Sequence, residues 1–249
     1  MSGSVLVAAS HGTSDAVGQR AVAELILAVA DSREDIDVVG SFVDVQQPDV
    51  PTTLAGLGFE SPVVIVPLLL SAGYHVRVDL ARDAREAEHP EVTVAAALGP
   101  DERITRVLAR RLRESGLRDE DVVVVAAAGS TDHRAVFDCQ IVGEQLAAVL
   151  KRPVTVGFIS AAEPRLSDAV QSARIDGHRV VVASYLLAPG YFARLVHEGG
   201  ADLVSPPLLS GDSVVPPELV ETVVDRYQAA CDRNVSSPLQ RLASQVTTS

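Results

Sequence analysis

An internal repeat constrains the fold of this chain more than any other feature of its sequence. The segment VLVAASHGTSD at 5–15 aligns with VVVVAAAGSTD at 122–132, which begins 117 residues later. Two further pairs of segments align at the same offset, namely 63–66 with 180–183 and 69–75 with 186–192. Three blocks in one order and at one spacing indicate two halves that share a fold.

The apolar residues of both halves fall in short valine-rich runs, separated by stretches rich in alanine, leucine and charged residues. Strands are predicted at residues 5–9, 38–43, 63–69, 92–98, 122–127, 154–159, 180–187 and near Leu203. Helices are predicted at residues 15–30, 52–57, 76–88, 101–115, 132–150, 165–175, 192–199 and 217–230. Apolar runs of this kind are typical of buried parallel strands, and their alternation with helices indicates right-handed crossovers. The sequence therefore predicts an α/β fold of two similar domains, each a parallel β-sheet flanked by helices and related by internal duplication.

The repeat also predicts where the domains begin and end. Residues 1–116 form the expected N-terminal domain and residues 117–231 the C-terminal domain, and the two meet in the polar stretch 114–121. From residue 232 to residue 249 the periodic pattern stops, and Asn, Ser, Gln and Thr dominate. A segment of this composition buries little apolar surface, so residues 232–249 are predicted to form a flexible tail.

Composition excludes several classes of protein. With 33 acidic and 21 basic residues, the 249-residue chain has a formal charge of −12, which disfavours nucleic acid and anionic membranes as partners. Cys139 and Cys231 are too few for a disulfide framework or a four-thiolate zinc site. No apolar run reaches the ~18 residues of a membrane span, and no signal peptide is recognised, so we expect a cytoplasmic protein. No glycine-rich nucleotide motif follows a strand, so no nucleotide cofactor is expected.

Three positions in the first half carry side chains that bind metals or move protons, and the second half has lost all three. The aligned pairs are His11 with Ala128, Asp44 with Ser160 and His75 with Phe192. Each of the three follows the carboxyl end of a predicted strand, where ligands bind in open α/β sheets. The sequence therefore predicts that His11, Asp44 and His75 converge on one site in the N-terminal half.

Simpler interpretations of the same residues stay open at this point. A histidine after a strand is often a cap or a surface residue, and an aspartate there is often a turn residue. The turn at 10–14 could merely open a capped helix, with Ser14 or Asp15 as the cap, or its N–H groups could hold an anion. The remaining histidines are interpreted as solvated, namely His89, His133, His178 and His197.

The chain resembles the class II chelatases of the sirohydrochlorin cobalto/ferrochelatase family (CbiX/SirB type), in the long form with a chelatase-like fold in each half. The resemblance covers about residues 4–230 and is carried by His11-Gly12, by FVDVQQP at 42–48 and by VPLLLSAGYH at 66–75. It implies a lyase that inserts a divalent metal into sirohydrochlorin without ATP. Fe²⁺, the favoured metal, would complete sirohaem synthesis, whereas Co²⁺ would serve cobalamin synthesis.

The resemblance also implies roles for individual residues. In the family two histidines hold the metal and assist deprotonation of the ring, and the matching positions are His11 and His75. Asp44 matches a carboxylate that is usually Glu, so its arm is one methylene shorter. For contacts with the substrate carboxylates we consider the turn before the first helix and two nearby arginines, namely Ser10, Gly12, Thr13, Ser14, Arg77 and Arg82.

The expected partners are therefore a tetrapyrrole and a divalent metal that is itself a substrate. We expect a monomer, because the duplication supplies within one chain the pairing that short forms of the family achieve with two subunits. Two other classes of function are alternatives. One is a metal or tetrapyrrole carrier without catalysis, and the other is a two-lobed protein that binds a small anion, which the missing export signal disfavours.

Overall fold

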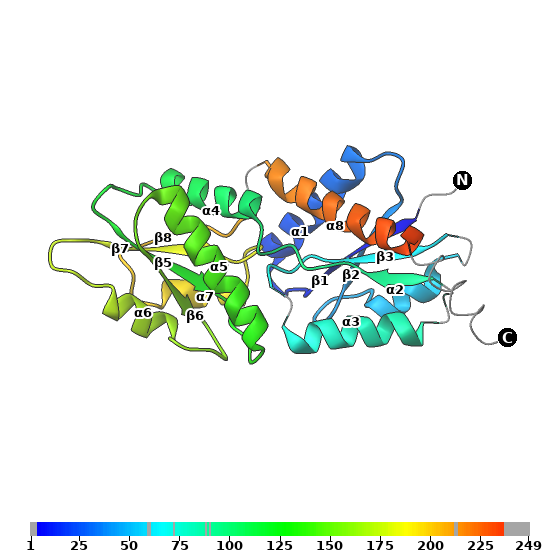
Figure 1. Ribbon diagram of the computed structural model, residues 1–249, viewed down its shortest axis with the longest axis horizontal. Coiled ribbons are helices and arrows are strands. Elements are labelled where there is room, and N and C mark those ends of the chain that lie inside the picture. The colour runs from blue at the N-terminus through cyan, green and yellow to red at the C-terminus, as the bar shows by residue number, and fades with distance from the viewer. Residues whose placement is uncertain are drawn as a thin grey trace.

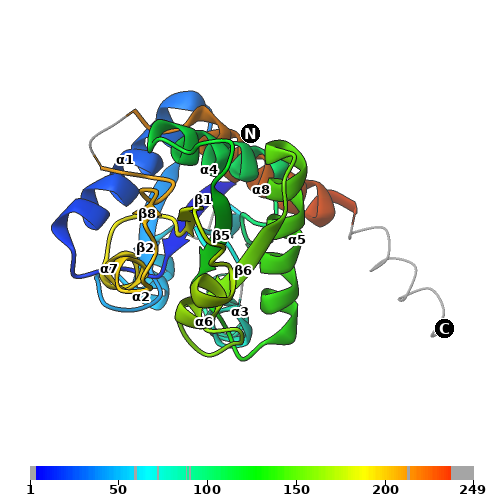
Figure 2. The same ribbon diagram turned by 90° about the vertical axis from the view of Figure 1, so that its left-hand side faces the viewer.

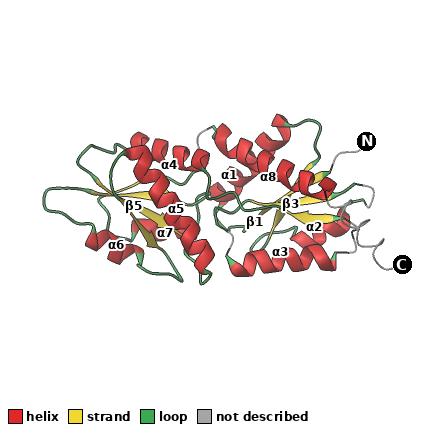
Figure 3. Cartoon of the chain, viewed as in Figure 1, coloured by secondary structure: helices red, strands yellow, loops and turns green. Residues whose placement is uncertain are grey.

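The fold is known from a computed structural model, which describes residues 4–58, 61–71, 73–87, 89, 91–211 and 214–236. The side chains of residues 74–77 and 234–236 are outside this description. Two four-stranded parallel sheets lie side by side along the long axis, and helices flank both (Figures 1 and 3). The predicted fold class is confirmed.

The first sheet has the strand order β2-β1-β3-β4 and the second has the order β6-β5-β7-β8. The elements built around the first sheet are β1 (Val5–Ser10), α1 (Ala16–Ser32), β2 (Val38–Phe42), α2 (Val50–Gly56), β3 (Val63–Pro67), α3 (Tyr74–Glu86) and β4 (Val92–Val94). The elements that follow are α4 (Glu102–Glu114), β5 (Val122–Ala127), α5 (His133–Leu150), β6 (Val154–Phe158), α6 (Leu166–Ser172), β7 (Val180–Tyr185), α7 (Tyr191–His197), β8 (Leu203–Val204) and α8 (Pro217–Ser236). Because the two strand orders are the same at the repeat offset, the duplication seen in sequence is a duplication of topology.

Most boundaries agree with prediction to within a few residues, and two differ for physical reasons. The strand predicted at 92–98 ends at Val94. Ala95 and Leu98 beyond its end are also buried, and an apolar run alone does not distinguish a strand from a buried coil segment. Helix α8 continues to Ser236, so the first residues of the predicted tail are helical, and residues 237–249 lie outside the described part. Among the described helices, none combines the length and the apolar character that crossing a bilayer requires.

The two halves exchange their last helices. Helix α4 follows the first sheet but packs on β7 and α5 of the second, and α8 follows the second sheet but packs on β3 and α1 of the first. In Figures 1 and 2, α4 and α8 lie on one side of the sheets, and α3 and α6 lie on the other. A boundary at 116/117 thus separates the sheets, but each sheet is covered in part by a helix from the other side of that boundary.

One apolar core runs through both lobes on the side of the exchanged helices. It joins Leu6 and Ala8 of β1 with Val123 and Val125 of β5, and each of these side chains is at most 1% exposed. On the other side each lobe has a smaller core of its own, under α2 and α3 in one case and under α6 in the other. Since burial of apolar surface is the main stabilising term in folding, the shared core couples the stability of the two lobes.

Arginine side chains fasten the exchanged helices. Arg226 of α8 donates from Nε to the Ala97 carbonyl oxygen and from Nη2 to that of Leu98, both at 2.8 Å. Its Nη2 also lies 3.3 Å from Oδ2 of Asp101, at the start of α4. A second link is the fork of Arg110 on α4, which binds both carboxylate oxygens of Glu218 on α8 at 2.6 and 3.1 Å.

We predict that Arg226→Met lowers the free energy of unfolding by about 2 kcal/mol, because two carbonyl groups and a carboxylate lose a charged donor. Urea titration followed by circular dichroism measures the change. Arg233→Met is the matched control, since Arg233 is exposed on the same helix, and it should cost less than about 0.5 kcal/mol. Both curves should show a single transition, and separate unfolding of two lobes would contradict the shared core.

Candidate active site at the carboxyl edge of the first sheet

The topology brings the three predicted residues to one edge of the first sheet. Strand β1 lies between β2 and β3, and all three run parallel. His11 directly follows β1, Asp44 follows β2 by two residues, and His75 lies in the first turn of α3, after β3. Their backbones therefore lie at neighbouring carboxyl ends, where the sequence predicted a site.

His11 and Asp44 are joined through their backbones. The Asp44 N–H donates to the His11 carbonyl oxygen at 3.0 Å, and the Val43 N–H donates to that of Ser10 at 2.8 Å. Gly12 between them has φ +89°, and a Cβ at this position would clash with the Asp44 carbonyl oxygen. Only glycine combines this conformation with so close an approach, so Gly12 fixes the spacing of the two loops.

Both side chains are exposed, and Asp44 also has a local role. Its Oδ1 accepts the Val45 N–H at 2.7 Å, as expected of an aspartate in a turn. A carboxylate has two oxygens and about four acceptor sites, so this bond leaves Asp44 able to bind a cation as well.

The convergence of three side chains stays a prediction, because the His75 side chain is outside the described part. Among the side chains that are described, no three of His, Cys, Asp or Glu gather closely enough to hold a metal. The Arg77 side chain is likewise outside the description. What the structure supports is the shared edge and the contact between His11 and Asp44.

The turn between β1 and α1 is closed by hydrogen bonds to its own side chains and to Gln46 of the loop after β2. Asp15 is the cap of α1, and its Oδ1 accepts the N–H groups of Val17 and Gly18 at 3.0 and 3.1 Å. The Thr13 N–H donates to Oε1 of Gln46 at 2.9 Å, and the Asp15 N–H donates to Oγ1 of Thr13 at 3.1 Å. Because these donors are engaged within the chain, an anion at this turn would have to contact other groups.

Two of the remaining candidates differ in how accessible they are. Ser14 is exposed. Ser10 is buried, and its hydroxyl has no hydrogen-bond partner among the described residues. The proposed substrate contacts of Ser10, Gly12, Thr13 and Ser14 therefore remain predictions, of which the exposed Ser14 is the simplest to reconcile with the structure.

Arg82 lies on the third turn of α3 and is already paired. Its guanidinium contacts Asp79 at 3.3 Å and Asp83 at 3.5 Å, and its side chain is half exposed. Burial raises the pKa of Asp83, and the charge of Arg82 opposes this rise. A substrate carboxylate would compete with these two aspartates for Arg82.

The second lobe faces this edge through a pair of reciprocal contacts. A Cβ on Gly190 would lie 3.1 Å from Oγ1 of Thr13, and one on Gly73 would lie 3.0 Å from Oγ of Ser130. At the repeat offset Thr13 corresponds to Ser130 and Gly73 to Gly190, so the two contacts are equivalent. The carboxyl edges of both sheets therefore face each other about a pseudo-two-fold axis, and the second lobe presents its own loops to the candidate site.

Two buried groups behind this contact take no part in binding a cation. Burial raises the pKa of Cys139 to about 11, and a hydrogen bond with Ser71 of the first lobe opposes this rise. Cys139 is thus a neutral core thiol at pH 7 rather than a thiolate ligand. Tyr185 is buried as well, and its hydroxyl donates to the Leu70 carbonyl oxygen across the lobes at 3.1 Å.

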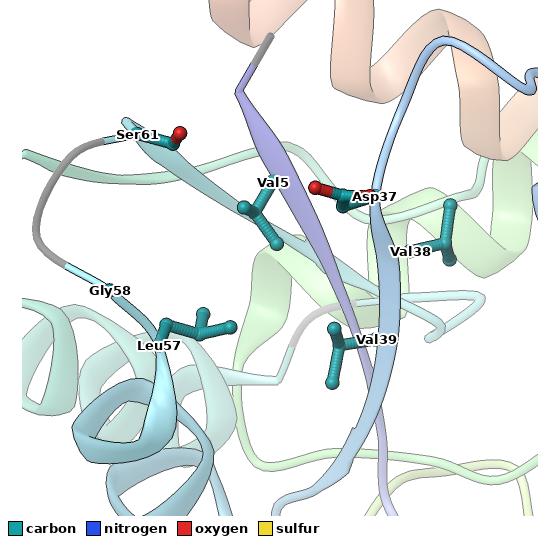
Figure 4. Close-up of a pocket in the computed structure, with 7 residues that line it drawn as sticks. All are labelled: Val5, Asp37, Val38, Val39, Leu57, Gly58 and Ser61. Atoms are coloured by element: carbon teal, nitrogen blue, oxygen red, sulfur yellow. The ribbon is translucent and has the colours of Figure 1, made fainter. Parts of the chain in front are cut away.

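An open hollow of about 690 Å³ lies at the opposite edge of the first sheet (Figure 4). Its lining is Val5, Asp37, Val38, Val39, Leu57, Gly58 and Ser61. The one charged group among these described residues is the carboxylate of Asp37, which would repel a polycarboxylate. The hollow also lies at the far edge of the sheet from the residues proposed to hold the metal. The hollow therefore does not mark the site.

One histidine differs from its interpretation as solvated. His89 is 7% exposed, and its Nε2 lies 3.2 Å from the Gly58 carbonyl oxygen. This contact joins residues 31 apart in the chain, which sequence spacing does not reveal. His133, His178 and His197 are exposed as predicted.

Comparison with known proteins places this arrangement in a family. The CbiX family model matches residues 5–115 and 122–198, so it covers both halves of the repeat. The chain belongs to the CbiX family.

The chain is similar in sequence to two curated proteins. It is 27% identical over 148 residues to the sirohydrochlorin ferrochelatase of Priestia megaterium, a match covering 55% of this chain and 54% of that protein. It is 32% identical over 76 residues to the sirohydrochlorin cobaltochelatase of Sulfurisphaera tokodaii, covering 29% of this chain and 62% of that protein. The chain thus spans about half to three-fifths of the length of these relatives.

Solved structures of the family share the fold. SirB from Bacillus subtilis with Fe³⁺ has a TM-score of 0.74 at 19% identity, covering 92% of this chain and 96% of that one. SirB from Bacillus subtilis subspecies spizizenii in complex with cobalt has a TM-score of 0.72 at 17% identity, covering 93% and 96%. At these identities the likeness shows that both lobes have the fold of full-length SirB.

We predict that Gly12→Ala lowers the free energy of unfolding by about 2–4 kcal/mol, because the new Cβ meets both a positive φ and the Asp44 carbonyl. Gly116→Ala is the matched control, since Gly116 has φ +91° with open space around it, and it should cost only about 1 kcal/mol. Chemical denaturation measures both. Equal losses in the two variants would show that the contact between the His11 and Asp44 loops is not tight.

Proposed function

We propose that this chain inserts a divalent metal, Fe²⁺ or Co²⁺, into sirohydrochlorin without using a nucleotide. The observation that carries the proposal is the shared edge of β2, β1 and β3, which holds Asp44, His11 and His75 in one lobe only. The family and the names of two relatives, a ferrochelatase and a cobaltochelatase of sirohydrochlorin, support the choice of substrate.

The metal would be held by His11 and His75 before transfer. Neutral imidazole is a borderline ligand that suits Fe²⁺ and Co²⁺ and holds them less firmly than thiolate does. Asp44 adds a negative charge beside His11, directly or through a water, and this lowers the electrostatic cost of holding a dication at an exposed edge. A moderately bound ion is what transfer requires, because the metal must leave the protein for the ring.

Insertion also releases two protons. The N–H bonds of two pyrrole rings break, the electron pairs of those nitrogens pass to the metal, and the protons need acceptors. Histidine usually titrates near neutrality, so it is well suited to accept a proton at working pH. His11 is exposed, and a proton taken up there passes readily to solvent. The net reaction exchanges two protons for one divalent ion and involves no redox step.

The donor set by itself accepts either metal, because imidazole and carboxylate bind Fe²⁺ and Co²⁺ comparably. We favour Fe²⁺, with the chain completing sirohaem synthesis, because sirohaem is needed more widely than cobalamin. Co²⁺ would place it in cobalamin synthesis. The alternative function is a carrier that binds metal or tetrapyrrole without turnover, and an anaerobic assay with each metal in parallel distinguishes all three.

We predict that His11→Ala and His75→Ala each lower the rate of insertion at least ~100-fold, because each removes a ligand and a proton acceptor. Anaerobic absorbance of the metallated product measures the rate. His133→Ala, on an exposed histidine of the second lobe, is the control and should retain the wild-type rate. Normal turnover in either first-lobe variant would reject the assignment, and stoichiometric binding without turnover by the wild type would identify a carrier.

Asp44 is tested against its counterpart in the repeat. We predict that Asp44→Ala lowers the insertion rate about tenfold. Ser160→Ala removes the side chain at the equivalent turn of the second lobe, where Ser160 Oγ donates to the Ala128 carbonyl oxygen at 2.9 Å, and should leave the rate unchanged. If the two substitutions have equal effects, Asp44 is only a turn residue.

Because the two lobes repeat, the proposed site can be tested by introducing its side chains into the second lobe. The triple variant Ala128→His, Ser160→Asp and Phe192→His gives the second lobe the three side chains proposed as ligands in the first. Since both lobes share their backbone topology, we predict that it binds two Co²⁺ per chain where the wild type binds one. Isothermal titration calorimetry without tetrapyrrole measures the stoichiometry. A folded variant that still binds one ion would show that these three positions do not form a site.

A further inference from the structure

Among the described residues, the exposed aromatic side chains lie on helices that begin at one edge of the second sheet. The sequence has five Phe and four Tyr residues. Among the described residues, the exposed ones are Phe137 at 60%, Tyr191 at 62% and Phe192 at 38%. Phe137 lies near the start of α5, and Tyr191 and Phe192 begin α7, so all three lie on helices that begin at the carboxyl ends of β5 and β7. This is the edge that faces the candidate site of the first lobe.

Tyr191, Phe192 and Arg194 form a connected group, called here the α7 patch. The Tyr191 and Phe192 ring centroids are 6.0 Å apart with a tilt of 36°, and the Arg194 guanidinium carbon lies 5.9 Å from the Tyr191 ring centroid. The Arg194 Nη1 also lies 3.3 Å from Oδ2 of Asp15 on the first lobe. The patch is therefore in contact with the turn that carries His11.

The position of the α7 patch in the repeat indicates a function for it. Phe192 corresponds to His75 and begins its helix in the same way, so the second lobe displays an aromatic ring where the first displays an imidazole. A second imidazole here would compete with the first lobe for the ion. A phenyl ring binds no divalent metal, but it offers a flat apolar face to another flat ring.

We propose that the α7 patch binds the substrate itself: Tyr191 and Phe192 contact the face of the tetrapyrrole, and Arg194 binds its peripheral carboxylates. This inference rests on the proposed function. The first lobe would then hold the metal and the second lobe the ring, so the two reactants meet between the facing carboxyl edges.

The chemistry of the ligand fits the patch. Sirohydrochlorin is a flat conjugated ring with an acidic rim, and aromatic side chains bind such faces by stacking or by edge-to-face contact. Arginine binds carboxylates with two parallel N–H donors. The Arg194 side chain is more than half exposed, and its carboxylate partner among the described residues is Asp15. In a chain with a net charge of −12, a cation beside the aromatic pair is what admits a polyanion.

Equilibrium binding of metal-free sirohydrochlorin tests the proposal without requiring turnover. The double variant Tyr191→Ser, Phe192→Ser should raise the dissociation constant about tenfold or more, measured by fluorescence titration. Arg194→Gln should raise it several-fold and reduce its dependence on salt. In turnover assays these variants should raise KM while kcat changes little. Co²⁺ binding without tetrapyrrole should match the wild type, because the metal ligands are on the other lobe.

Ile175→Ser is the matched control. Ile175 is 58% exposed in the loop before β7, at the amino edge of the same sheet, and its substitution should leave tetrapyrrole binding unchanged. If the double variant binds sirohydrochlorin as tightly as the wild type, the patch proposal is wrong while the proposed function stands. If the wild type binds no sirohydrochlorin, both fail. Loss of a dimer in sedimentation experiments on the double variant would instead identify the patch as a contact between two copies, and would also overturn the proposal.

Discussion

The exchange of helices α4 and α8 is the constraint on which the rest of the structure depends. Each sheet needs apolar cover on both faces, and on one face part of that cover comes from the last helix of the other half. Because burying these faces is a large part of the folding free energy, the lobes are held together by the same contacts that fold them. The facing of their carboxyl edges follows from this exchange, and so does the pair of equivalent contacts across the pseudo-two-fold axis.

The repeat provides an internal control on what the candidate residues are for. Gly12 and Gly129 have φ values of +89° and +90°, and Val45 and Ala161 have φ values of +62° and +56°. The bond from the Asp44 N–H to the His11 carbonyl has its counterpart in the second lobe, also at 3.0 Å. The second lobe thus builds the same turns with alanine and serine in place of histidine and aspartate. The fold does not require those side chains, which argues for a chemical role.

The sequence predicted the layers well because parallel strands buried on both faces leave continuous apolar runs. The same reasoning wrongly predicts a strand at Ala95 and Leu98, because a buried coil segment also leaves an apolar run in the sequence. The helix exchange could not be predicted, because a repeat shows that α4 and α8 are equivalent but not which sheet each covers. The edge that carries His11 and Asp44 was predicted because both residues follow predicted parallel strands, whereas the His75 side chain lies outside the described residues.

The α7 patch was missed at the sequence level, although a signal was present. Tyr191 and Phe192 are adjacent in a chain that is only 4% aromatic, and Phe192 replaces a histidine of the repeat. A comparison that counts only lost metal ligands records Phe192 as the loss of a histidine. The same replacement also changes a polar surface to an aromatic one.

The distribution of arginine explains how so acidic a chain could accept an acidic substrate. Arg103, Arg110 and Arg226 lie at the α4–α8 junction, where they bind carboxylates and carbonyls that are fixed by the fold. Arg179 is likewise held at the amino edge of the second sheet by both oxygens of Asp121. Fixed partners of this kind leave little capacity for a ligand. Arg194 differs because its carboxylate partner, Asp15, also caps α1 through its other oxygen, so a substrate carboxylate could displace Arg194 without uncapping the helix. Arg194, which contacts the turn that carries His11, can therefore change partners at little structural cost.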